Sequence, residues 1–534
     1  MLTLDKNIFK NKEEYVKVGI KLPEYNIVEM RENTKQKPVW IHFGGGNIFR
    51  CFHASIQQDL LNKGLADTGI ITVDTYDEEI VRRVYKNHDN LTLVCVTKIN
   101  GEIDKEVIAS VAESHYYDES VPASYARVKE VFANPSLQMA SITITEKGYN
   151  LKSSNGQYSS IVKEDMENGP EHAKHTMSIL ASLLYERYKK GAYPIAMLST
   201  DNFSHNGDKL KSSIIEIAKQ WEKNGFVERA FIDYLLDEEK VSYPWSMIDR
   251  ITPRPSETVL NHLKKLGFKN MEMVQTKKHS VSAPFVNTEE VHYLVVEDNF
   301  PNGRPSLEEA GVYLTDKQTV DKVERMKVCT CLNPLHTAMA IYGCLLGYSS
   351  IADEMNDHQI KALIEKVGYQ EGLPVVVDPK IINPNQFIDE VVNKRLPNKN
   401  IPDTPQRIAS DTSQKLAIRY GETIKLYKDK AKYLQFIPLV IAGWCRYLMG
   451  LDDKGEKMEL SPDPMLDELQ QYISPIKFGE QDSVKENLHG LLSNESIFGI
   501  DLYHAGLGSK IESYVKELIA GPGSVRSTLK KHLG

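Results

Sequence analysis

A glycine cluster between a strand pattern and a helix pattern is the feature that most constrains the fold. Residues 39–51 read VWIHFGGGNIFRC, in which a short apolar run leads into three consecutive glycines. The next residues, 52–64, carry apolar side chains at helical spacing. A strand, a tight turn and a helix in this order are typical of the phosphate-binding turn of a dinucleotide-binding domain.

Further apolar runs alternate with helical segments along the first half of the chain. Strand patterns occur at residues 69–77, 91–99, 139–149 and 193–204, and an amphipathic helical segment covers 175–190. Strands interleaved with helices predict a parallel, doubly wound sheet of the Rossmann type. Ligands bind at the carboxyl ends of the strands in such sheets, so the polar ending of the last run is of functional interest.

Beyond about residue 285 the strand pattern fades. Helical patterns follow at 336–348, 357–370 and 438–450, and a stretch rich in Pro and Asn, 382–407, predicts loops around a short helix. With 534 residues the chain is too long for one core. The expected fold class is therefore α/β, with a Rossmann-type NAD-binding domain over 1–285 and a mainly α-helical substrate domain over 286–534.

Composition narrows the class of partner. A net charge of −8 argues against a nucleic-acid partner. The six cysteines lack the density of a disulfide scaffold and the paired spacing of a zinc site. The first residues have no apolar core of signal-peptide length, and the most apolar run, 436–449, is too short to span a bilayer. We expect a cytoplasmic protein, a monomer or small homo-oligomer, that binds neither membrane nor metal and acts on a small molecule.

The glycine cluster indicates which residues would bind the cofactor. Gly44 and Gly46 fit the first two positions of the dinucleotide fingerprint, whereas the third position departs from it. Asn47 and Ile48 come next, where a helix N-terminus would face the pyrophosphate. An ordinary strand-to-helix turn is the alternative interpretation of the cluster by itself.

The end of the second strand pattern indicates the choice of cofactor. Asp74 stands where a carboxylate accepts hydrogen bonds from the adenosine ribose and repels a 2′-phosphate, which favours NAD over NADP. It lies 28 residues after Gly46, beyond the usual offset of about 20. Asp77 is the competing candidate, and Asp74 as a mere turn cap is the structural alternative.

Residues 323–336, VERMKVCTCLNPLH, contain the largest concentration of potential catalytic side chains in the chain. This segment holds Glu324, Lys327, Asn333 and His336 within thirteen positions. Asparagine followed by proline predicts a helix start, with Asn333 as the N-cap and His336 in the first turn. A solvated charge on a helix end is the alternative interpretation of Lys327.

Several segments in the same order resemble the polyol-specific long-chain dehydrogenase/reductase, or mannitol dehydrogenase, family. They are GGGNIFR (44–50), TITEKGY (143–149), STDN (199–202), MIDRITP (247–253), VVEDNFPNGRP (295–305), the 323–336 segment and SDTSQK (410–415). The family contains mannitol 2-dehydrogenases, fructuronate reductases (D-mannonate oxidoreductases) and tagaturonate reductases, and the length and glycine turn are most similar to those of the fructuronate reductases. The resemblance implies NAD-dependent, metal-independent interconversion of D-fructuronate and D-mannonate. Mannitol 2-dehydrogenase and tagaturonate reductase activities are the alternatives within the family.

The resemblance also implies the catalytic residues. It makes Lys327 the acid–base lysine, and Asn202 and Asn333 the amides that stabilise charge on the reacting oxygen. The family's active-site histidine matches His336, and its acidic helpers match Asp249 and Glu324. A lysine can act as the base only where burial lowers its pKa, so Lys327 is expected to be buried.

One spacing departs from the family pattern. Lys327 stands six residues before Asn333, where mannitol dehydrogenases have five, and Pro334–Leu335 replace the usual small pair. Glu324 is expected to pass protons between the lysine and solvent, His336 to position the substrate hydroxyl or the lysine, and Asp249 to hold a neighbouring donor. The alternative interpretation of these three residues is that they are hydrogen-bonded polar residues at a domain interface without a catalytic role.

A sugar acid also requires a cation for its carboxylate. Arg407 lies shortly before the SDTSQK segment that resembles the family, and Lys415 is its last residue, although each is also explained as a surface charge. Tyr185 and Lys189 have the Y-x-x-x-K spacing of short-chain dehydrogenases, but the glycine turn and the chain length do not fit that family. A zinc alcohol dehydrogenase is disfavoured because no Cys and His set has ligand spacing. A dinucleotide-binding sensor without catalysis is the alternative from another class.

Overall fold

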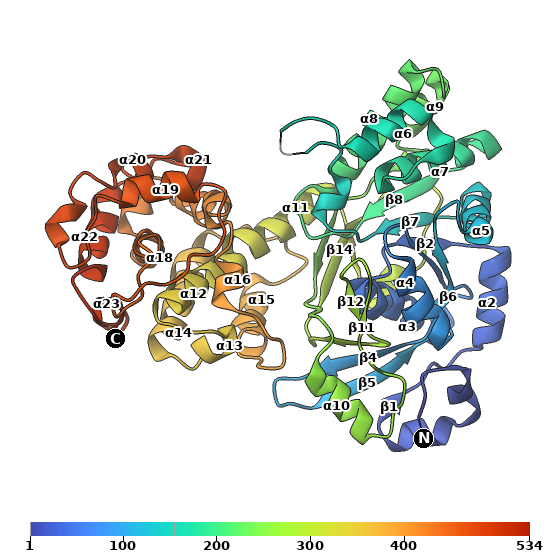
Figure 1. Cartoon of the computed structure of the whole chain (residues 1–534), viewed down its shortest axis with the longest axis horizontal. Coiled ribbons are helices and arrows are strands. Elements are labelled where there is room, and N and C mark those ends of the chain that lie inside the picture. The colour runs from blue at the N-terminus through green and yellow to red at the C-terminus, as the bar shows by residue number, and fades with distance from the viewer. Residues whose placement is uncertain (1, 154) are drawn as a thin grey trace. The chain divides into compact units, whose positions relative to one another are not determined.

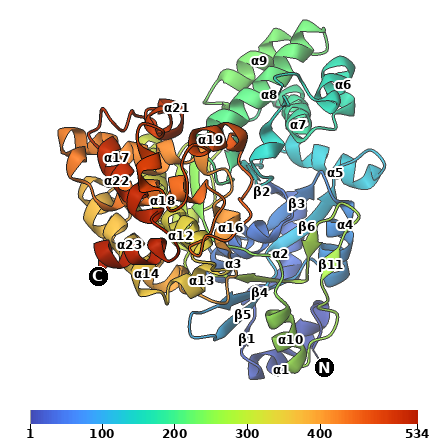
Figure 2. The ribbon, with the colours of Figure 1, turned by 60° about the vertical axis from the view of Figure 1, so that its left-hand side comes forward.

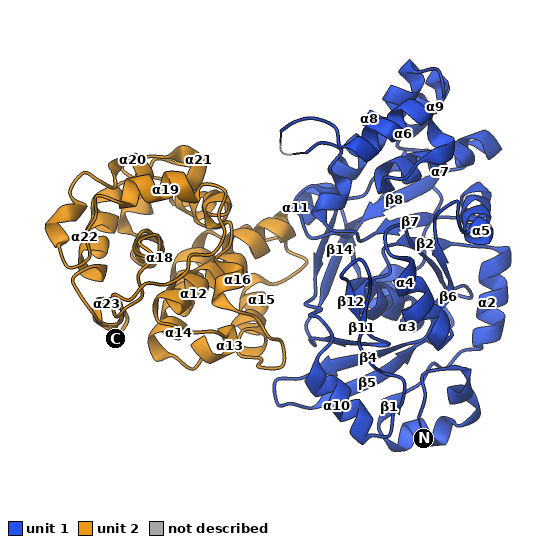
Figure 3. Cartoon of the chain, in the orientation of Figure 1, with its two compact units in different colours: residues 1–321 blue, residues 322–534 orange. Residues whose placement is uncertain are grey.

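The computed structural model describes residues 2–153 and 155–534, which divide into two compact units. Unit 1 is Met1–Asp321 and unit 2 is Lys322–Gly534 (Figure 1, Figure 3). The boundary falls inside one helix, α11 (Lys317–Met326).

Unit 1 is built on a six-stranded parallel sheet with the strand order β6-β3-β2-β7-β8-β9. Its strands are β2 (Trp40–Phe43), β3 (Ile70–Asp74), β6 (Val111–Tyr116), β7 (Met139–Ile142), β8 (Ile195–Ser199) and β9 (Val241–Ser242). The chain moves outward from β2 in one direction and then resumes beside β2 in the other, which is the doubly wound Rossmann topology. The expected fold class is confirmed.

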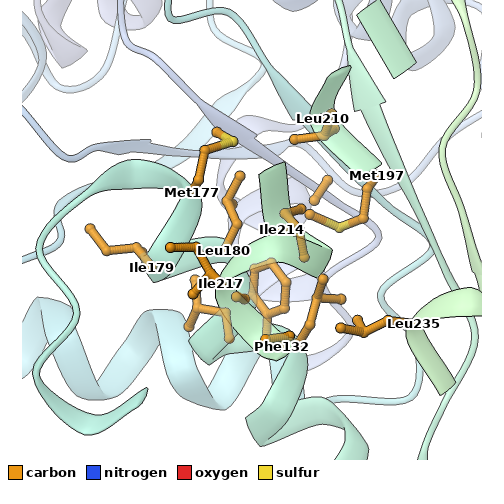
Figure 4. Close-up of a cluster of buried hydrophobic side chains, with 14 of the residues drawn as sticks. Phe132, Met177, Ile179, Leu180, Met197, Leu210, Ile214, Ile217 and Leu235 are labelled. Carbon is orange, nitrogen blue, oxygen red and sulfur yellow. The ribbon is translucent and has the colours of Figure 1, made fainter. Parts of the chain in front are cut away.

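Both faces of this sheet are covered, because neighbouring side chains of a strand point to opposite sides. Ile41 and Phe43 of β2 enter a core with α5, α7, α8 and α9, whereas Trp40 enters the core with α3 on the other face. Figure 4 shows the first core, where Phe132 packs among Ile214, Ile217 and Leu235. The near-continuous apolar strands are those expected of a sheet buried on both sides.

The helices of unit 1 alternate with the strands. They are α1 (Lys12–Lys17), α2 (Ile27–Gln36), α3 (Ala54–Asn62), α4 (Glu78–Ile80), α5 (Pro122–Ala133), α6 (Ser160–Asn168), α7 (Thr176–Gly191), α8 (Asn206–Lys223), α9 (Arg229–Leu236) and α10 (Glu257–Lys265).

Three smaller sheets complete unit 1. Their strands are β1 (Ile20–Lys21), β4 (Thr92–Thr97), β5 (Ile103–Ile108) and β13 (Phe285–Thr288) in one; β10 (Ser246–Asp249), β14 (Tyr293–Glu297) and β15 (Tyr313–Thr315) in another; and β11 (Val274–Gln275) with β12 (Val281–Ser282) in the third. The strand predicted at 91–99 is β4, which belongs to the first of these and pairs antiparallel with β5. The third strand of the parallel sheet is instead β6, VAESHY, whose polar side chains hide it from an apolar pattern.

The domain boundary differs from the expected 285/286. β13 pairs with β4, and β14 pairs with β10, so the chain beyond residue 285 still completes the sheets of unit 1. The strands there are short and separated by loops rich in polar residues, which weakens their pattern in the sequence. The helical unit accordingly begins at Lys322.

Unit 2 is helical, as expected. Its helices are α12 (Asn333–Leu345), α13 (Ile351–Glu354), α14 (His358–Glu365), α15 (Pro384–Glu390), α16 (Pro405–Ile408), α17 (Glu422–Tyr427), α18 (Phe436–Tyr447), α19 (Leu466–Ile473), α20 (His489–Leu492), α21 (Glu495–Phe498), α22 (Gly508–Leu518) and α23 (Ser524–Leu533). The buried helix α12 packs against α18, which packs in turn against α22 (Figure 2). The contact is close because Gly443 of α18 faces the ring of Tyr342, whose hydroxyl donates to the carbonyl of Leu439 at 2.8 Å.

Several helical segments of the chain have π pitch, with one residue more in the turn than an α-helix. Three of them lie in unit 2 near the predicted site residues: η8 (Lys327–Cys331), η11 (Val391–Arg395) and η13 (Ala417–Gly421). π-turns occur frequently at functional sites, because they re-aim side chains locally.

One continuous helical stretch among the described residues, Lys317–Leu345, is long and apolar enough to span a bilayer by length and composition. Of the most apolar part of this stretch, 83% is buried in the fold. A buried core helix has the same properties, so this stretch carries no membrane assignment.

Candidate active site

The glycine turn after β2 is packed on one side and open on the other. Gly44 has a φ of +110°, and a Cβ at this position would lie 2.0 Å from the carbonyl oxygen of Thr143. The Tyr85 hydroxyl donates to the carbonyl of Gly45 at 2.9 Å. A Cβ on Gly46, in contrast, would meet no atom within 4 Å. The turn therefore fits a pyrophosphate that approaches the backbone at Gly46.

Asn47 uses its side chain to fasten the turn. Its amide donates to the carbonyl of Pro253 at 3.3 Å and accepts from the Arg50 guanidinium at 2.7 Å. Arg50 is fully buried and also donates to the carbonyl of Ala283 at 2.6 Å. Asn47 and Ile48 form the first residues of the helix, so only their backbone amides are placed to meet an anion.

Asp74 and Asp77, the two candidates for the ribose, have different partners. Asp77 uses both carboxylate oxygens within the fold: Oδ1 accepts from the Glu79 amide at 3.2 Å and Oδ2 from the Thr276 hydroxyl at 2.6 Å. Asp74 directs Oδ1 to the amides of Tyr76 and Asp77, at 2.8 Å each. Burial raises the pKa of Asp74, and the backbone of Gly45 in the glycine turn is among the groups that lower it. Asp74 thus caps a turn and also borders the glycine turn, which favours it over Asp77.

A cavity of about 380 Å³ borders Thr75, the residue that follows Asp74. Its lining includes Thr75, Tyr117 and Tyr125, and the two tyrosine rings stack with their centroids 4.7 Å apart. In Rossmann folds the adenosine half of a dinucleotide lies at this end of the sheet. The sequence did not indicate this cavity, because Tyr117 follows β6, the strand whose polar residues obscure its pattern.

Asn202 lies exposed just after β8, at the carboxyl edge of the parallel sheet. Its neighbour Asp201 is buried, and the carboxylate accepts from the amides of Ile144 and Thr145 at 2.8 Å each and from the Tyr149 hydroxyl at 2.7 Å. Burial raises the pKa of Asp201, and these three donors act against the shift. The carboxylate therefore joins the TITEKGY and STDN segments.

Asp249 is the last residue of β10 and is 6% exposed. The start of β10 is tied to the end of β8, because the Ser246 hydroxyl donates to the carbonyl of Ser199 at 2.6 Å. The next residue after Asp249, Arg250, donates to the carbonyl of Cys51 in the helix after the glycine turn. Asp249 thus lies on a segment that links the carboxyl edge of the sheet to the helix after the glycine turn.

Lys327 is the first residue of the π-turn η8 and is only 2% exposed, as an acid–base lysine requires. The Leu332 amide donates to the Lys327 carbonyl at 3.1 Å, which is a bond across five residues. Glu324 lies three residues earlier in α11 and is partly exposed. The π pitch begins at Lys327, so the extra residue separates Lys327 from the residues that follow it and leaves its α-helical spacing from Glu324 unchanged.

Asn333 is not the N-cap that the sequence predicted. Leu332 occupies that position with φ −130°, Asn333 is the first residue of α12, and no side chain caps this helix. The π-turn displaces the helix start by one residue. The Asn333 amide is consequently not used for capping the helix.

His336 lies in the first turn of α12 among basic side chains. Desolvation lowers the pKa of His336 to about 4. The charge of Asp403 raises this pKa, and the charges of Arg395, Arg407 and Arg419 lower it. The imidazole is therefore neutral near pH 7, which suits a hydrogen-bonding role.

Arg407 and Lys415, the predicted carboxylate ligands, lie in this same cluster. The Arg407 guanidinium forms a bidentate pair with Asp403, with Nε at 2.6 Å from Oδ1. Lys415 directs its ammonium to the carbonyl oxygens of Ser410 and Ile408. Burial lowers the pKa of Lys415, and the nearby charges of Arg419 and Arg407 add to this effect.

Tyr185 and Lys189, the pair with short-chain dehydrogenase spacing, make surface contacts on α7. Lys189 pairs with Glu186 at 2.9 Å, and the Tyr185 hydroxyl donates to Glu228 at 3.0 Å. Within residues 2–153 and 155–534 there is no group of three or more His, Cys, Asp or Glu side chains suited to hold a metal.

The predicted residues thus form two groups, one in each unit. The glycine turn, Asp74, Asn202 and Asp249 belong to unit 1. Glu324, Lys327, Asn333, His336, Arg407 and Lys415 belong to unit 2. Arg395 and Arg419 were not predicted, because nothing in their local sequence distinguishes them from surface charges.

Two family models match the chain: the mannitol dehydrogenase Rossmann domain over residues 39–309 and the mannitol dehydrogenase C-terminal domain over residues 319–519. A D-mannonate oxidoreductase of Thermotoga maritima is 53% identical over 100% of this chain and 99% of its own. A D-mannonate oxidoreductase of Escherichia coli is 27% identical over 86% of this chain and 89% of its own.

Solved structures agree with this assignment. The mannitol 2-dehydrogenase of Pseudomonas fluorescens, in a ternary complex with NAD and D-mannitol, is 25% identical with a TM-score of 0.70 over 99% of both chains. A D-sorbitol dehydrogenase shares the fold, with a TM-score of 0.79 over 96% of this chain and 97% of its own. The chain is therefore an oxidoreductase that belongs to the mannitol dehydrogenase family.

Proposed function

We propose that this chain is an NAD-dependent oxidoreductase that interconverts D-fructuronate and D-mannonate, with Lys327 as the acid–base group and without a metal ion. The observation that carries the sugar-acid assignment is the cationic surrounding of His336, where Arg395, Arg407 and Arg419 all act on one imidazole. A neutral ketose has no charge to offer such a cluster, whereas a sugar acid carries a carboxylate. The relative at 53% identity is named for the same substrate.

The residues of unit 1 fit a bound dinucleotide. Gly46 leaves room at its backbone for the pyrophosphate, and the carboxylate of Asp74 at the end of β3 is suited to the ribose hydroxyls. A negative charge at this place repels the 2′-phosphate of NADP, so NAD is the proposed cofactor. When bound, NADH supplies the hydride that reduces the ketone carbon.

In the reducing direction Lys327 donates a proton to the ketone oxygen, and in the oxidising direction it accepts the hydroxyl proton. The amides of Asn202 and Asn333 are proposed to stabilise the charge that develops on that oxygen, which removes the need for a metal. Glu324 is partly exposed near Lys327 in sequence and exchanges the proton with solvent. His336 stays neutral and orients the substrate hydroxyl or the lysine, and Asp249 holds a neighbouring donor.

Rates of NADH oxidation with D-fructuronate, D-tagaturonate and D-fructose test this function. We expect the highest kcat/KM with fructuronate, and the rate should survive exhaustive chelation. A preference for fructose or tagaturonate would reassign the enzyme within its family. Failure to oxidise NADH with any of the three, in a protein that still binds NADH, would favour the non-catalytic sensor.

A further inference from the structure

Arg419 is a partly buried cation of the cluster around His336, and the proposed mechanism gives it no separate role. It lies in the π-turn η13 and donates to the Thr337 hydroxyl at 2.5 Å, one residue after His336. In the structure as described for residues 2–153 and 155–534, no carboxylate forms an ion pair with this guanidinium. Desolvation lowers the pKa of Arg419 to about 10. A partly desolvated guanidinium without a counter-ion lowers the stability of the fold and is placed to pair with an anion that enters from outside.

The surroundings of Arg419 add positive charge. Arg419 and Arg407 both act on the ammonium of Lys415, and both act together with Arg395 on His336. The elements that carry Arg407 and Arg419, α16 and η13, each pack against α12. The cluster is therefore built around the first turn of the helix that begins with Asn333.

Two carboxylates of this region, Asp403 and Asp463, are already paired. Asp403 holds the guanidinium of Arg407 in a bidentate pair, and Asp463 accepts from the amide and the hydroxyl of Ser413. Arg407 would have to give up Asp403 in order to bind a substrate carboxylate by its fork. Arg419 would give up only one hydrogen bond to a hydroxyl, so it is the better cation for this task.

We propose that Arg419 binds the carboxylate of the sugar-acid substrate and makes the enzyme select acids over neutral ketoses. This inference rests on the proposed function. A guanidinium pairs with a carboxylate through two parallel hydrogen bonds, and the geometry also fixes which end of the sugar chain lies at His336. Arg407 and Lys415 contribute positive charge around the pair.

The test compares Arg419→Gln with the wild type, using D-fructuronate and D-fructose as substrates. We expect kcat/KM for fructuronate to fall by about 10- to 100-fold, the worth of a hydrogen bond to a charged group, while kcat/KM for fructose does not fall. Arg419→Lys, which keeps the charge but not the fork, should retain part of the fructuronate activity. Arg325→Gln is the matched control, because Arg325 forms a surface ion pair with Glu422 at 3.1 Å.

Binding supplies a second readout. Titration of D-mannonate into the NADH-saturated protein should show weaker binding to Arg419→Gln, and D-mannitol, which lacks the carboxylate, should show no change. If Arg419→Gln does not fold, the same ratios are measured on Arg419→Lys. A wild type that does not reduce fructuronate would contradict the proposed function itself. If the wild type reduces fructuronate and the folded Arg419→Gln variant keeps the wild-type ratio of fructuronate to fructose activity, the role proposed for Arg419 is wrong. The proposed function is then unaffected.

Discussion

The backbone amide of Leu332 donates to the carbonyl of Lys327, five residues earlier, at 3.1 Å. An α-helix would make this bond across four residues, so the turn from Lys327 to Cys331 contains one residue more. The spacing from Lys327 to Asn333 exceeds that of the mannitol dehydrogenases by the same single residue. The π-turn gives a physical account of the departure, because it absorbs an insertion without rotating the helical segments on either side.

Deletion of Val328 should therefore be tolerated. The variant can close the turn with α-helical bonds, and the segments that carry Glu324 and Asn333 keep their phase. We expect its melting temperature to stay close to that of the wild type, as followed by circular dichroism. Deletion of Ala340, in the regular and buried part of α12, should lower it strongly, because every later side chain of that helix changes face. Equal losses in the two deletions would contradict the insertion account.

Lys327→Ala should lower turnover by about 10² to 10⁴, the usual contribution of general acid–base catalysis. The affinity for NADH should change little, as measured by fluorescence titration, because the glycine turn and Asp74 lie in unit 1. Arg325→Ala is the nearby control, since Arg325 pairs with Glu422 and is expected to keep normal turnover. Normal turnover in Lys327→Ala with a loss in Arg325→Ala would show that the alignment across the π-turn is incorrect.

Asp74→Ser should narrow the preference for NADH over NADPH, measured as the ratio of kcat/KM values. The loss of the carboxylate removes the repulsion of the 2′-phosphate. Asp77→Ser should leave the ratio unchanged, because both carboxylate oxygens of Asp77 are used within the fold, by the Glu79 amide and the Thr276 hydroxyl. A changed cofactor ratio in Asp77→Ser, with none in Asp74→Ser, would exchange the two roles.

The glycine turn offers a matched pair of substitutions. Gly46→Ala should fold normally, since its Cβ meets no protein atom within 4 Å, and should weaken NADH binding about tenfold or more by crowding the pyrophosphate. Gly44→Ala should destabilise the protein itself, because its Cβ would lie 2.0 Å from the Thr143 carbonyl and its φ is +110°. Thermal melting and NADH titration of both variants check this. Unaltered NADH affinity in Gly46→Ala would count against a pyrophosphate at this turn.

Two buried histidines should make unit 1 sensitive to acid. Burial lowers the pKa of His42 well below its usual value and that of His53 to about 4. As pH falls below about 6.5, the unfolded chain takes up the protons first, so stability is full above that pH and declines toward pH 4. The contribution of His53 to this loss is about 3 kcal/mol.

Urea unfolding of the protein between pH 7 and pH 4, followed by tryptophan fluorescence, measures this decline. His53→Gln should flatten the slope, although it also perturbs the contact of His53 with Thr200 at 2.8 Å. His358→Gln, at an exposed position, should leave the slope as it is in the wild type. An identical slope in wild type and His53→Gln would contradict the assignment.

Much of the fold could be predicted from the sequence because its signals are local. The apolar runs of β2, β3, β7 and β8 and the glycines that follow β2 indicate a buried parallel sheet. β6 could not be predicted because half of its side chains are polar, and the boundary at Lys322 could not because short strands complete sheets begun about 200 residues earlier. That Arg419 meets Thr337 depends on tertiary packing between η13 and α12, which no local pattern encodes.

The carboxylate of Asp201 accepts hydrogen bonds from Ile144, Thr145 and Tyr149, and Thr145 has a φ of +68°. This one side chain satisfies two backbone amides of a loop that lies more than fifty residues away in sequence. In a chimera between this chain and a distant relative, the two loops form a single cassette. Grafting residues 143–149 without residues 199–202 separates the amides from their carboxylate, whereas moving both together preserves the bonds that shape the loop.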